Sequence, residues 1–218
     1  MGWLFLLRIK YKMTKIISFI SRKGGTGKTT SAIHLATMLH SLGHKLCVLE
    51  TDNNYTLNTL RKMEMYKTGA KEDAVFKIIG SEDKTVLADI ASLKEKNLDF
   101  ILIDSAGKTT DEHIKKLSIA SDLVIVPTSL TPNDLLVTYQ TIEDIKPATK
   151  HNAKMKILVL PNRVHTATKI ATVKEALSEL DAFVLNVKVP AKNIYANFST
   201  ILPEKEFLVI AKEILTHL

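Results

Sequence analysis

The chain has 218 residues, a length that fits a single α/β domain with one hydrophobic core. Its hydrophobic content of 45% is ordinary for a globular chain, and no segment approaches the roughly 20 consecutive apolar residues of a membrane-spanning helix. The single cysteine, Cys47, excludes an intrachain disulfide framework and any metal or cluster site that needs two cysteines, and it suits a reducing cytoplasm. The formal net charge of +7 indicates an anionic partner, either nucleic acid or an acidic membrane surface.

Residues 1–12 differ from the rest of the chain. Their apolar run is too short for a signal-peptide core, and its charges follow it instead of preceding it. Gly2 is placed for myristoylation, but Leu6 stands where Ser or Thr is required. Met13 lies just before the first predicted strand. We therefore expect an N-terminal extension outside the core, followed by a single domain over residues 13–218.

A glycine-rich loop, Lys23-Gly24-Gly25-Thr26-Gly27-Lys28-Thr29-Thr30, joins a predicted strand at residues 16–20 to a predicted helix at residues 29–42. Because the glycines have no Cβ, the backbone N–H groups can curl around a phosphate, and the helix start adds the positive end of its dipole. The whole loop is therefore a nucleotide-binding candidate. The spacing predicts Lys28 on the β- and γ-phosphates of ATP and the Thr29 hydroxyl on Mg²⁺.

The loop departs from the strict pattern G-x-x-x-x-G-K-[ST]. Arg22 stands at the first position of that pattern. A second lysine, Lys23, precedes Lys28 by five residues.

Acidic residues follow two more predicted strands. Residues 45–49 read as a strand that ends in Glu50-Thr51-Asp52, which completes a right-handed parallel βαβ unit. Residues 100–103 are fully apolar and are followed by Asp104, as in a central parallel strand with an acid at its C-terminal end. Ligands bind at that edge of open α/β sheets, so Asp104 is a candidate for the Mg²⁺ shell.

The rest of the chain continues the alternation of strands and helices. Residues 53–98 are the least informative, with helical spacing at 57–63 and 86–93 and a strand candidate at 75–79. Further strands are predicted at 123–127, 156–160 and 183–187, with helices at 132–145 and 204–218. Asn162 follows one of these strands and either hydrogen-bonds a base or satisfies a turn. The pattern predicts a three-layer α/β/α fold with a mostly parallel central sheet.

These motifs resemble the ParA/MinD family of P-loop ATPases. Lys23–Thr30 is similar to the deviant Walker A motif of that family, Glu50-Thr51-Asp52 falls at its Walker A′ acids, and Asp104 at its Walker B acid. Thr131-Pro132-Asn133-Asp134-Leu135 resembles the proline-rich segment of the small plasmid-partition ParA proteins. The resemblance covers nearly all of the chain from Met13.

The resemblance implies a dimer that closes face to face over two ATP molecules with Mg²⁺. Lys23 would cross to the nucleotide of the partner chain and support hydrolysis there, and Lys28 would hold the nucleotide of its own chain. Asp52 would position the attacking water. Glu50, which replaces the usual Asp, would reach Mg²⁺ through a water, and Asn162 would lie near the adenine. Pro132 and Asp134 become candidates for the dimer interface, together with Lys23.

The resemblance also implies a surface that the ATP-bound dimer binds and a ParB-like or other partner protein that stimulates hydrolysis. The C-terminal helix mixes Glu204, Glu206 and Glu213 with Lys205 and Lys212, which argues against a basic membrane helix and for packing on the core. Basic residues gather in the C-terminal third, and an ordinary solvated basic surface is the alternative reading. We therefore expect the surface to be nonspecific DNA and the location to be the cytoplasm, in association with the nucleoid. The DNA-binding candidates are Lys156, Arg163, Lys188 and Lys192.

Two other functions are weighed. One is a MinD-like ATPase that is placed on a membrane, with residues 1–12 as the contact. The other is a metabolic enzyme with the same core, such as an amide ligase or a small-molecule kinase, against which Lys23 argues. The sequence names neither the cargo nor the stimulating partner.

Overall fold

The computed structural model describes residues 13–52, 54–107 and 110–218. Its strands form one eight-stranded sheet in the order β3-β2-β4-β1-β5-β6-β7, with β8 paired to β6. All the strand pairs are parallel. The strands are β1 (Lys15–Phe19), β2 (Leu46–Glu50), β3 (Lys77–Gly80), β4 (Phe100–Asp104), β5 (Leu123–Thr128), β6 (Lys156–Val164), β7 (Phe183–Val184) and β8 (Val189–Pro190).

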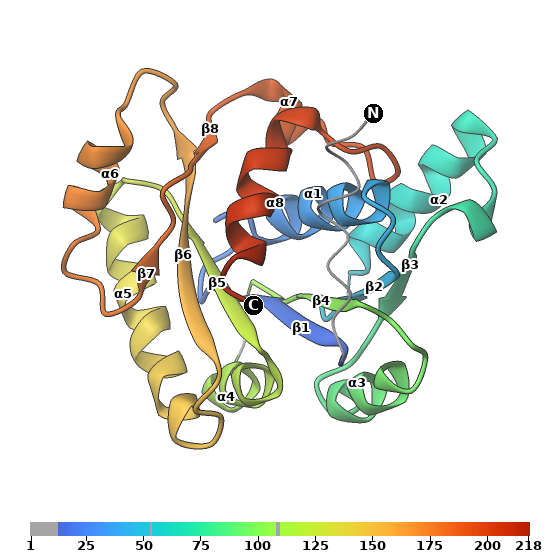
Figure 1. Cartoon of the computed structure of the whole chain (residues 1–218), viewed down its shortest axis with the longest axis horizontal. Helices are drawn as coiled ribbons and strands as arrows, with labels where there is room; N and C mark the ends of the chain where they lie inside the picture. Colours follow the sequence, from blue (N-terminus) through green and yellow to red (C-terminus); the bar gives the residue numbers. More distant parts are fainter. Residues whose placement is uncertain (1–12, 53, 108–109) are drawn as a thin grey trace.

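Helices cover both faces of this sheet (Figure 1). Helices α1, α2 and α8 contribute to one apolar cluster, whereas α3, α4, α5 and α6 contribute to the other. The three-layer α/β/α arrangement predicted from the sequence is therefore confirmed. The α-helices are α1 (Lys28–Ser41), α2 (Thr56–Thr68), α3 (Val86–Lys94), α4 (Asp111–Ala120), α5 (Pro132–Ile145), α6 (Ile170–Ala176), α7 (Asn193–Ala196) and α8 (Leu208–Leu215).

The central strands lie where the sequence predicts them, and the marginal elements differ. The strand predicted at 75–79 begins two residues later, at Lys77. The prediction of a strand over 183–187 is wrong, because only Phe183–Val184 pair and β8 follows as a separate short strand. The physical reason is that β6 is nine residues long and offers two pairing sites, with a register irregularity between Asn162 and Val164 that shifts the chain.

The closing helix packs on the core, as its mixed charges predict. It consists of a 3₁₀ turn at Lys205–Phe207 followed by α8, and Phe207, Ala211 and Ile214 are completely buried against the cluster that includes α1. None of the helices in the described part of the chain is long and apolar enough to cross a membrane. The extension predicted at residues 1–12 lies outside the described residues.

Helix α2 links the acid-bearing end of β2 to the C-terminal segment. Arg61, which is 5% exposed, donates to the Phe76 carbonyl (2.8 Å) and to the Thr200 hydroxyl (3.1 Å), and its guanidinium lies over the Phe76 ring. Glu64 accepts hydrogen bonds from the Thr200 backbone N–H (2.7 Å) and hydroxyl (2.6 Å). A buried guanidinium with satisfied donors is costly to remove, so these bonds hold α2 and residues 199–201 together.

Candidate active site

The functional candidates meet at the C-terminal edge of three adjacent strands. In the sheet register, Asp104 at the end of β4 lies opposite Phe19 at the end of β1 and opposite Glu50 at the end of β2. The glycine-rich loop leaves β1 directly above this point and leads into α1. Parallel strands bring their C-terminal ends to one edge, so the loop, the Glu50–Asp52 segment and Asp104 form one site.

The loop has the backbone that phosphate binding requires. Gly25 (φ 77°) and Gly27 (φ 99°) adopt left-handed conformations that L side chains rarely take. Gly107 lies against the loop from the other side, because a Cβ on it would stand 3.0 Å from Gly24 Cα and 3.7 Å from Lys28 Nζ. Glycines on both sides therefore leave the backbone open to a phosphate chain.

Lys28 points into the site and is only 5% exposed. Its ammonium donates to the Lys23 carbonyl at 3.1 Å. Burial lowers the pKa of Lys28, and the negative charges of Asp104 and Asp52 oppose this shift. The ammonium is thus a desolvated cation that interacts strongly with a phosphate.

Asp104 is almost completely buried, with 2% exposure. Asp104 Oδ1 has no hydrogen-bond partner among the described residues. Burial raises the pKa of Asp104 to about 7, and the nearby Thr29 hydroxyl and the Lys28 charge oppose this shift. An unsatisfied buried carboxylate oxygen needs a cation or a donor.

The residues present fit a nucleotide with Mg²⁺. Thr26 Oγ1 in the loop, Ser31 Oγ in the first turn of α1 and Ser105 Oγ directly after β4 join Asp104 Oδ1 as buried polar atoms without partners among the described residues. The part of the chain that the structure describes contains no group of three His, Cys, Asp or Glu residues that could hold a metal by itself. Mg²⁺ often has few protein ligands, and it takes its remaining oxygens from phosphate and water.

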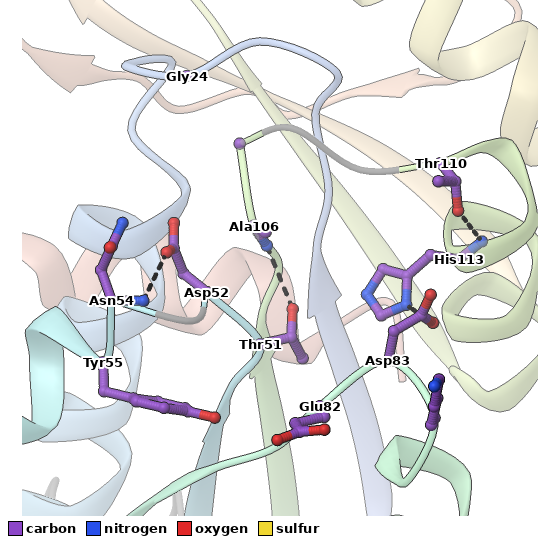
Figure 2. A pocket seen from close by; sticks show the side chains of 12 residues that line it. Gly24, Thr51, Asp52, Asn54, Tyr55, Glu82, Asp83, Ala106, Thr110 and His113 are labelled. Carbon is purple, nitrogen blue, oxygen red and sulfur yellow. Dashed lines mark hydrogen bonds and ion pairs between the residues drawn. The ribbon is translucent and has the colours of Figure 1, made fainter.

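A cavity of about 780 Å³ extends from the loop past Asp52. Figure 2 shows Asp52 and Asn54 on one side of it and His113 with Asp83 on the other. The Asp52 carboxylate accepts a hydrogen bond from the Asn54 N–H at 3.0 Å, and the cavity reaches Gly24 of the loop. Asp52 therefore faces a cavity that is continuous with the glycine-rich loop.

Several cavity residues carry no sequence signal. His113 at the start of α4 pairs with Asp83, and Glu82 lines the same wall. Thr51 Oγ1 accepts from the Ala106 N–H at 3.2 Å and so ties the end of β2 to the segment after β4. Glu82 and Asp83 lie between β3 and α3, and His113 lies in the first turn of α4, so no local spacing could have identified this side of the cavity.

Glu50 is engaged by the first turn of α2. It is 1% exposed, and its two carboxylate oxygens accept hydrogen bonds from the backbone N–H groups of Leu57 (2.8 Å) and Asn58 (3.2 Å). Burial raises the pKa of Glu50, and these two bonds oppose the shift. The longer side chain reaches the helix N-terminus, which accounts structurally for Glu at this position. A water-mediated contact of Glu50 with Mg²⁺ stays a prediction.

Lys23 points away from the loop toward α5. Its ammonium lies 2.6 Å from Asp134 Oδ1 in the same chain, and this hydrogen bond lowers the pKa of Asp134. The neighbouring Arg22 pairs with Asp111 and Asp144. Two of the three residues predicted at a dimer interface, Lys23 and Asp134, are thus in direct contact, and the third, Pro132, is exposed at the start of α5.

Asn162 supports the loop. It is 3% exposed, its amide nitrogen donates to the Thr26 carbonyl at 2.7 Å, and a Cβ on Gly27 would stand 2.0 Å from that nitrogen. The sequence left two roles open for the Asn162 side chain, a hydrogen bond to a base or a hydrogen bond within its own turn. The bond to the Thr26 carbonyl is neither of these. A contact with adenine stays a prediction.

The four DNA candidates do not share one surface. Arg163, Lys188 and Lys192 gather where β8 pairs with the end of β6, whereas Lys156 begins β6 at the opposite edge of the sheet. Lys188 donates to the carbonyls of residues 165, 166 and 168, and Lys192 pairs with Glu206 at 2.7 Å. Arg163 is exposed and, among the described residues, is not paired with a carboxylate.

Comparison with known proteins assigns the family. The sequence matches the family of VirC1 proteins over residues 14–215. This chain belongs to the VirC1 family. Protein virC1 of Rhizobium rhizogenes is 27% identical over 180 residues, which cover 81% of this chain and 75% of that protein. Maintenance of carboxysome distribution protein A of Halothiobacillus neapolitanus is 26% identical over 177 residues, which cover 80% of this chain and 79% of that protein.

Solved structures share the fold of this VirC1-family chain. A plasmid partition protein from Borrelia burgdorferi is 20% identical with a TM-score of 0.64, covering 95% of this chain and 100% of that one. Cobyrinic acid a,c-diamide synthase from Mycobacterium smegmatis, with bound ADP and magnesium, is 17% identical with a TM-score of 0.69, covering 94% and 95%. The predicted membership of the ParA/MinD group of P-loop ATPases is confirmed.

Gly27→Ala tests the backbone of the loop. We expect the free energy of unfolding of the nucleotide-free protein to fall by about 1–3 kcal/mol, because Ala is strained at positive φ and its methyl group meets Asn162. Denaturant unfolding measures this change. Gly24→Ala is the control, since its added methyl group meets nothing within 4 Å and should change stability by less than about 0.5 kcal/mol. Equal effects of the two variants would contradict the assigned geometry.

Asp104→Asn tests the buried acid through pH. The unfolded chain ionises near its usual pKa of about 4, whereas the folded pKa is about 7. The folded state therefore binds the extra proton between these values, and stability falls as pH rises through this window. We expect Asp104→Asn to remove this fall and to be more stable than wild type at pH 8, by roughly 2 kcal/mol or more.

The Asp104→Asn measurement uses urea unfolding without nucleotide or Mg²⁺ at pH 4 to 8. Asp73→Asn, a change at an exposed acid, is the control and should keep the wild-type slope. A wild-type slope in Asp104→Asn would show that the Asp104 charge is not desolvated.

Proposed function

We propose that this chain is an ATPase that forms an ATP-dependent sandwich dimer, binds nonspecific DNA in that state, and leaves it after partner-stimulated hydrolysis. The observation that carries the proposal is the pair of lysines on one loop. Lys28 is buried and directed into the site, whereas the Lys23 side chain is 40% exposed and directed outward. An outward cation at the mouth of a phosphate site is placed to serve a second chain.

Lys28, Thr29 and Asp104 would hold the nucleotide and its metal. The loop N–H groups and the Lys28 ammonium bind the phosphates, and their desolvation strengthens this interaction. The Thr29 hydroxyl and the unpartnered Asp104 oxygen would be the protein ligands for Mg²⁺. When bound, Mg²⁺ neutralises charge that develops on the phosphate oxygens.

Asp52 would orient the attacking water. Its carboxylate lines the cavity beside Gly24, and the Asn54 N–H fixes one of its oxygens at 3.0 Å. A carboxylate that is held at one oxygen can accept a proton or a hydrogen bond at the other. Water reaches it through the open side of the cavity.

Lys23 from a second chain would complete each site. A cation supplied in trans stabilises transition-state charge only in the dimer, so hydrolysis becomes dependent on association. This requirement separates the proposal from a metabolic enzyme with the same fold, which acts on a small substrate within one chain. The names of the relatives, which refer to carboxysome distribution and plasmid partition, support the positioning of a large cargo.

Nonspecific DNA is the proposed surface, with a nucleoid-associated cytoplasmic location. The net charge of +7 favours a polyanion, and α8 buries Ile210, Ala211, Ile214 and Leu215 in the core. The cationic group around Arg163, Lys188 and Lys192 lies at the β6–β8 end, and a dimer would carry two copies of it. A ParB-like or other protein would stimulate hydrolysis and so release the dimer.

Lys28→Ala and Asp52→Ala separate binding from hydrolysis. We expect Lys28→Ala to lower ATP affinity more than about tenfold, since it removes a charge-assisted contact. Asp52→Ala should bind ATP and dimerise but hydrolyse about 100-fold more slowly or worse, because the water is no longer positioned. Titration calorimetry, light scattering and phosphate release measure the three properties, and exposed Lys62→Ala is the control. If wild type shows no ATP-dependent dimer, the proposal fails.

Arg163→Asn tests the DNA surface. Asn tolerates the left-handed backbone of this residue (φ 55°), so the change removes the charge with little strain. We expect the slope of log affinity against log salt to fall by about 1 for each chain of the ATP-bound dimer. DNA co-sedimentation at several salt concentrations measures the slope. Lys156→Ala, at the other end of β6, should leave the slope unchanged. A smaller slope in Lys156→Ala and an unchanged slope in Arg163→Asn would place the DNA at the Lys156 end.

A further inference from the structure

The outward lysine of the loop is not free in the single chain. Its ammonium forms a 2.6 Å hydrogen-bonded ion pair with Asp134, 111 residues away on α5. The proposed function requires this ammonium to leave for the nucleotide of a second chain. One cation therefore has two competing anionic partners.

Asp134 is a preformed anchor. Its side chain is 17% exposed, compared with 40% for Lys23, and its second oxygen accepts a hydrogen bond from the Ser129 hydroxyl. Asp134 lies in the first turn of α5, where Thr131 caps the helix and accepts a hydrogen bond from the Asp134 N–H at 3.3 Å. The positive end of the helix dipole stabilises an anion at this position. The carboxylate thus stays in place whether or not Lys23 is bound.

Only the Lys23 side chain has to move for the pair to open. The Lys23 carbonyl accepts the hydrogen bond from Lys28 Nζ, which keeps the backbone at the phosphate loop. A lysine stem has several rotatable bonds and can swing between anions while its backbone is fixed. The exchange can therefore occur without disturbing the residue that holds the nucleotide.

We propose that Asp134 is a positioning residue that holds Lys23 in its own chain until the triphosphate of a second chain competes for the ammonium. This inference rests on the proposed function and adds a restraint to it. A triphosphate carries more negative charge than one carboxylate, so ATP competes well and ADP competes less well. The ion pair then favours the dimer with ATP over the dimer with ADP and re-forms after hydrolysis.

Asp134→Asn tests the restraint, because it keeps the size of the side chain and removes the charge. We expect the dimer Kd with a non-hydrolysable ATP analogue to fall roughly 5- to 30-fold, since two partly exposed ion pairs, one in each chain, no longer have to break. Dimerisation with ADP should become measurable in the same variant. Sedimentation velocity over a range of protein concentrations measures both constants. A Kd equal to that of wild type, or weaker, would overturn the proposal.

Matched variants exclude a merely structural role. Asp144 lies on α5, as Asp134 does, and pairs with Arg22. Asp144→Asn breaks that neighbouring ion pair and should leave the dimer Kd within about twofold of wild type. Asp134→Glu keeps the charge and should restore the wild-type Kd and the weak response to ADP. Lys23→Ala combined with Asp134→Asn should behave as Lys23→Ala alone, because the restraint acts only through Lys23.

The two possible failures are distinguishable. A wild-type chain that stays monomeric with the ATP analogue removes the proposed function, and the restraint with it. A wild-type dimer that Asp134→Asn does not tighten removes the restraint alone. If Asp134→Asn unfolds, Ser129→Ala replaces it, since it weakens the anchor at its second oxygen. Ser129→Ala should tighten the dimer by a smaller factor, and no tightening would count against the proposal.

Discussion

Lys28 and Asp104 are opposite charges that the fold buries at the edge of the sheet, with 5% and 2% exposure. Burial lowers the pKa of the lysine and raises that of the acid, which shows that each charge has lost more hydration than its surroundings return. The Asp104 oxygen without a hydrogen-bond partner has likewise lost hydration that no described residue replaces. A bound nucleotide with Mg²⁺ would supply the missing interactions, so the nucleotide-free chain is held in a state that favours binding. The surrounding contacts keep this pair in place.

Four strand ends build the surroundings of that pair. The β1 end supplies the loop, the β4 end supplies Asp104, and the β2 end supplies Glu50 and Asp52. Glu50 uses its carboxylate to hold the start of α2, and Arg61 and Glu64 tie α2 to the C-terminal segment. Asn162 at the β6 end supports the loop from the other side. A series of hydrogen bonds therefore connects the β2 end of the site to α2 and to the C-terminal segment.

Much of the site could be predicted because its determinants are local. The glycines of the loop, the lysine at the helix start and the acids after apolar strands lie within short windows, and parallel strands bring such residues to one edge. The exact roles of Glu50 and Asn162 could not be predicted. Glu50 meets a helix start seven residues later, and Asn162 meets a carbonyl 136 residues earlier. The cavity wall of Glu82, Asp83 and His113 was missed, since a loop after β3 and the start of α4 build it together.

The sequence by itself determined the phosphate loop, the parallel α/β fold, the packing of the closing helix and the ParA/MinD resemblance. These depend on glycine conformations, on the period of apolar residues and on charge composition, which short stretches of chain encode. Only the tertiary structure decided that Lys23 rests on Asp134, that the cationic residues divide between two edges, and that β8 is separate from β7. Those facts depend on the strand order and on the packing of α5 beside β5. Residues more than 100 positions apart meet there, and no local pattern records such a meeting.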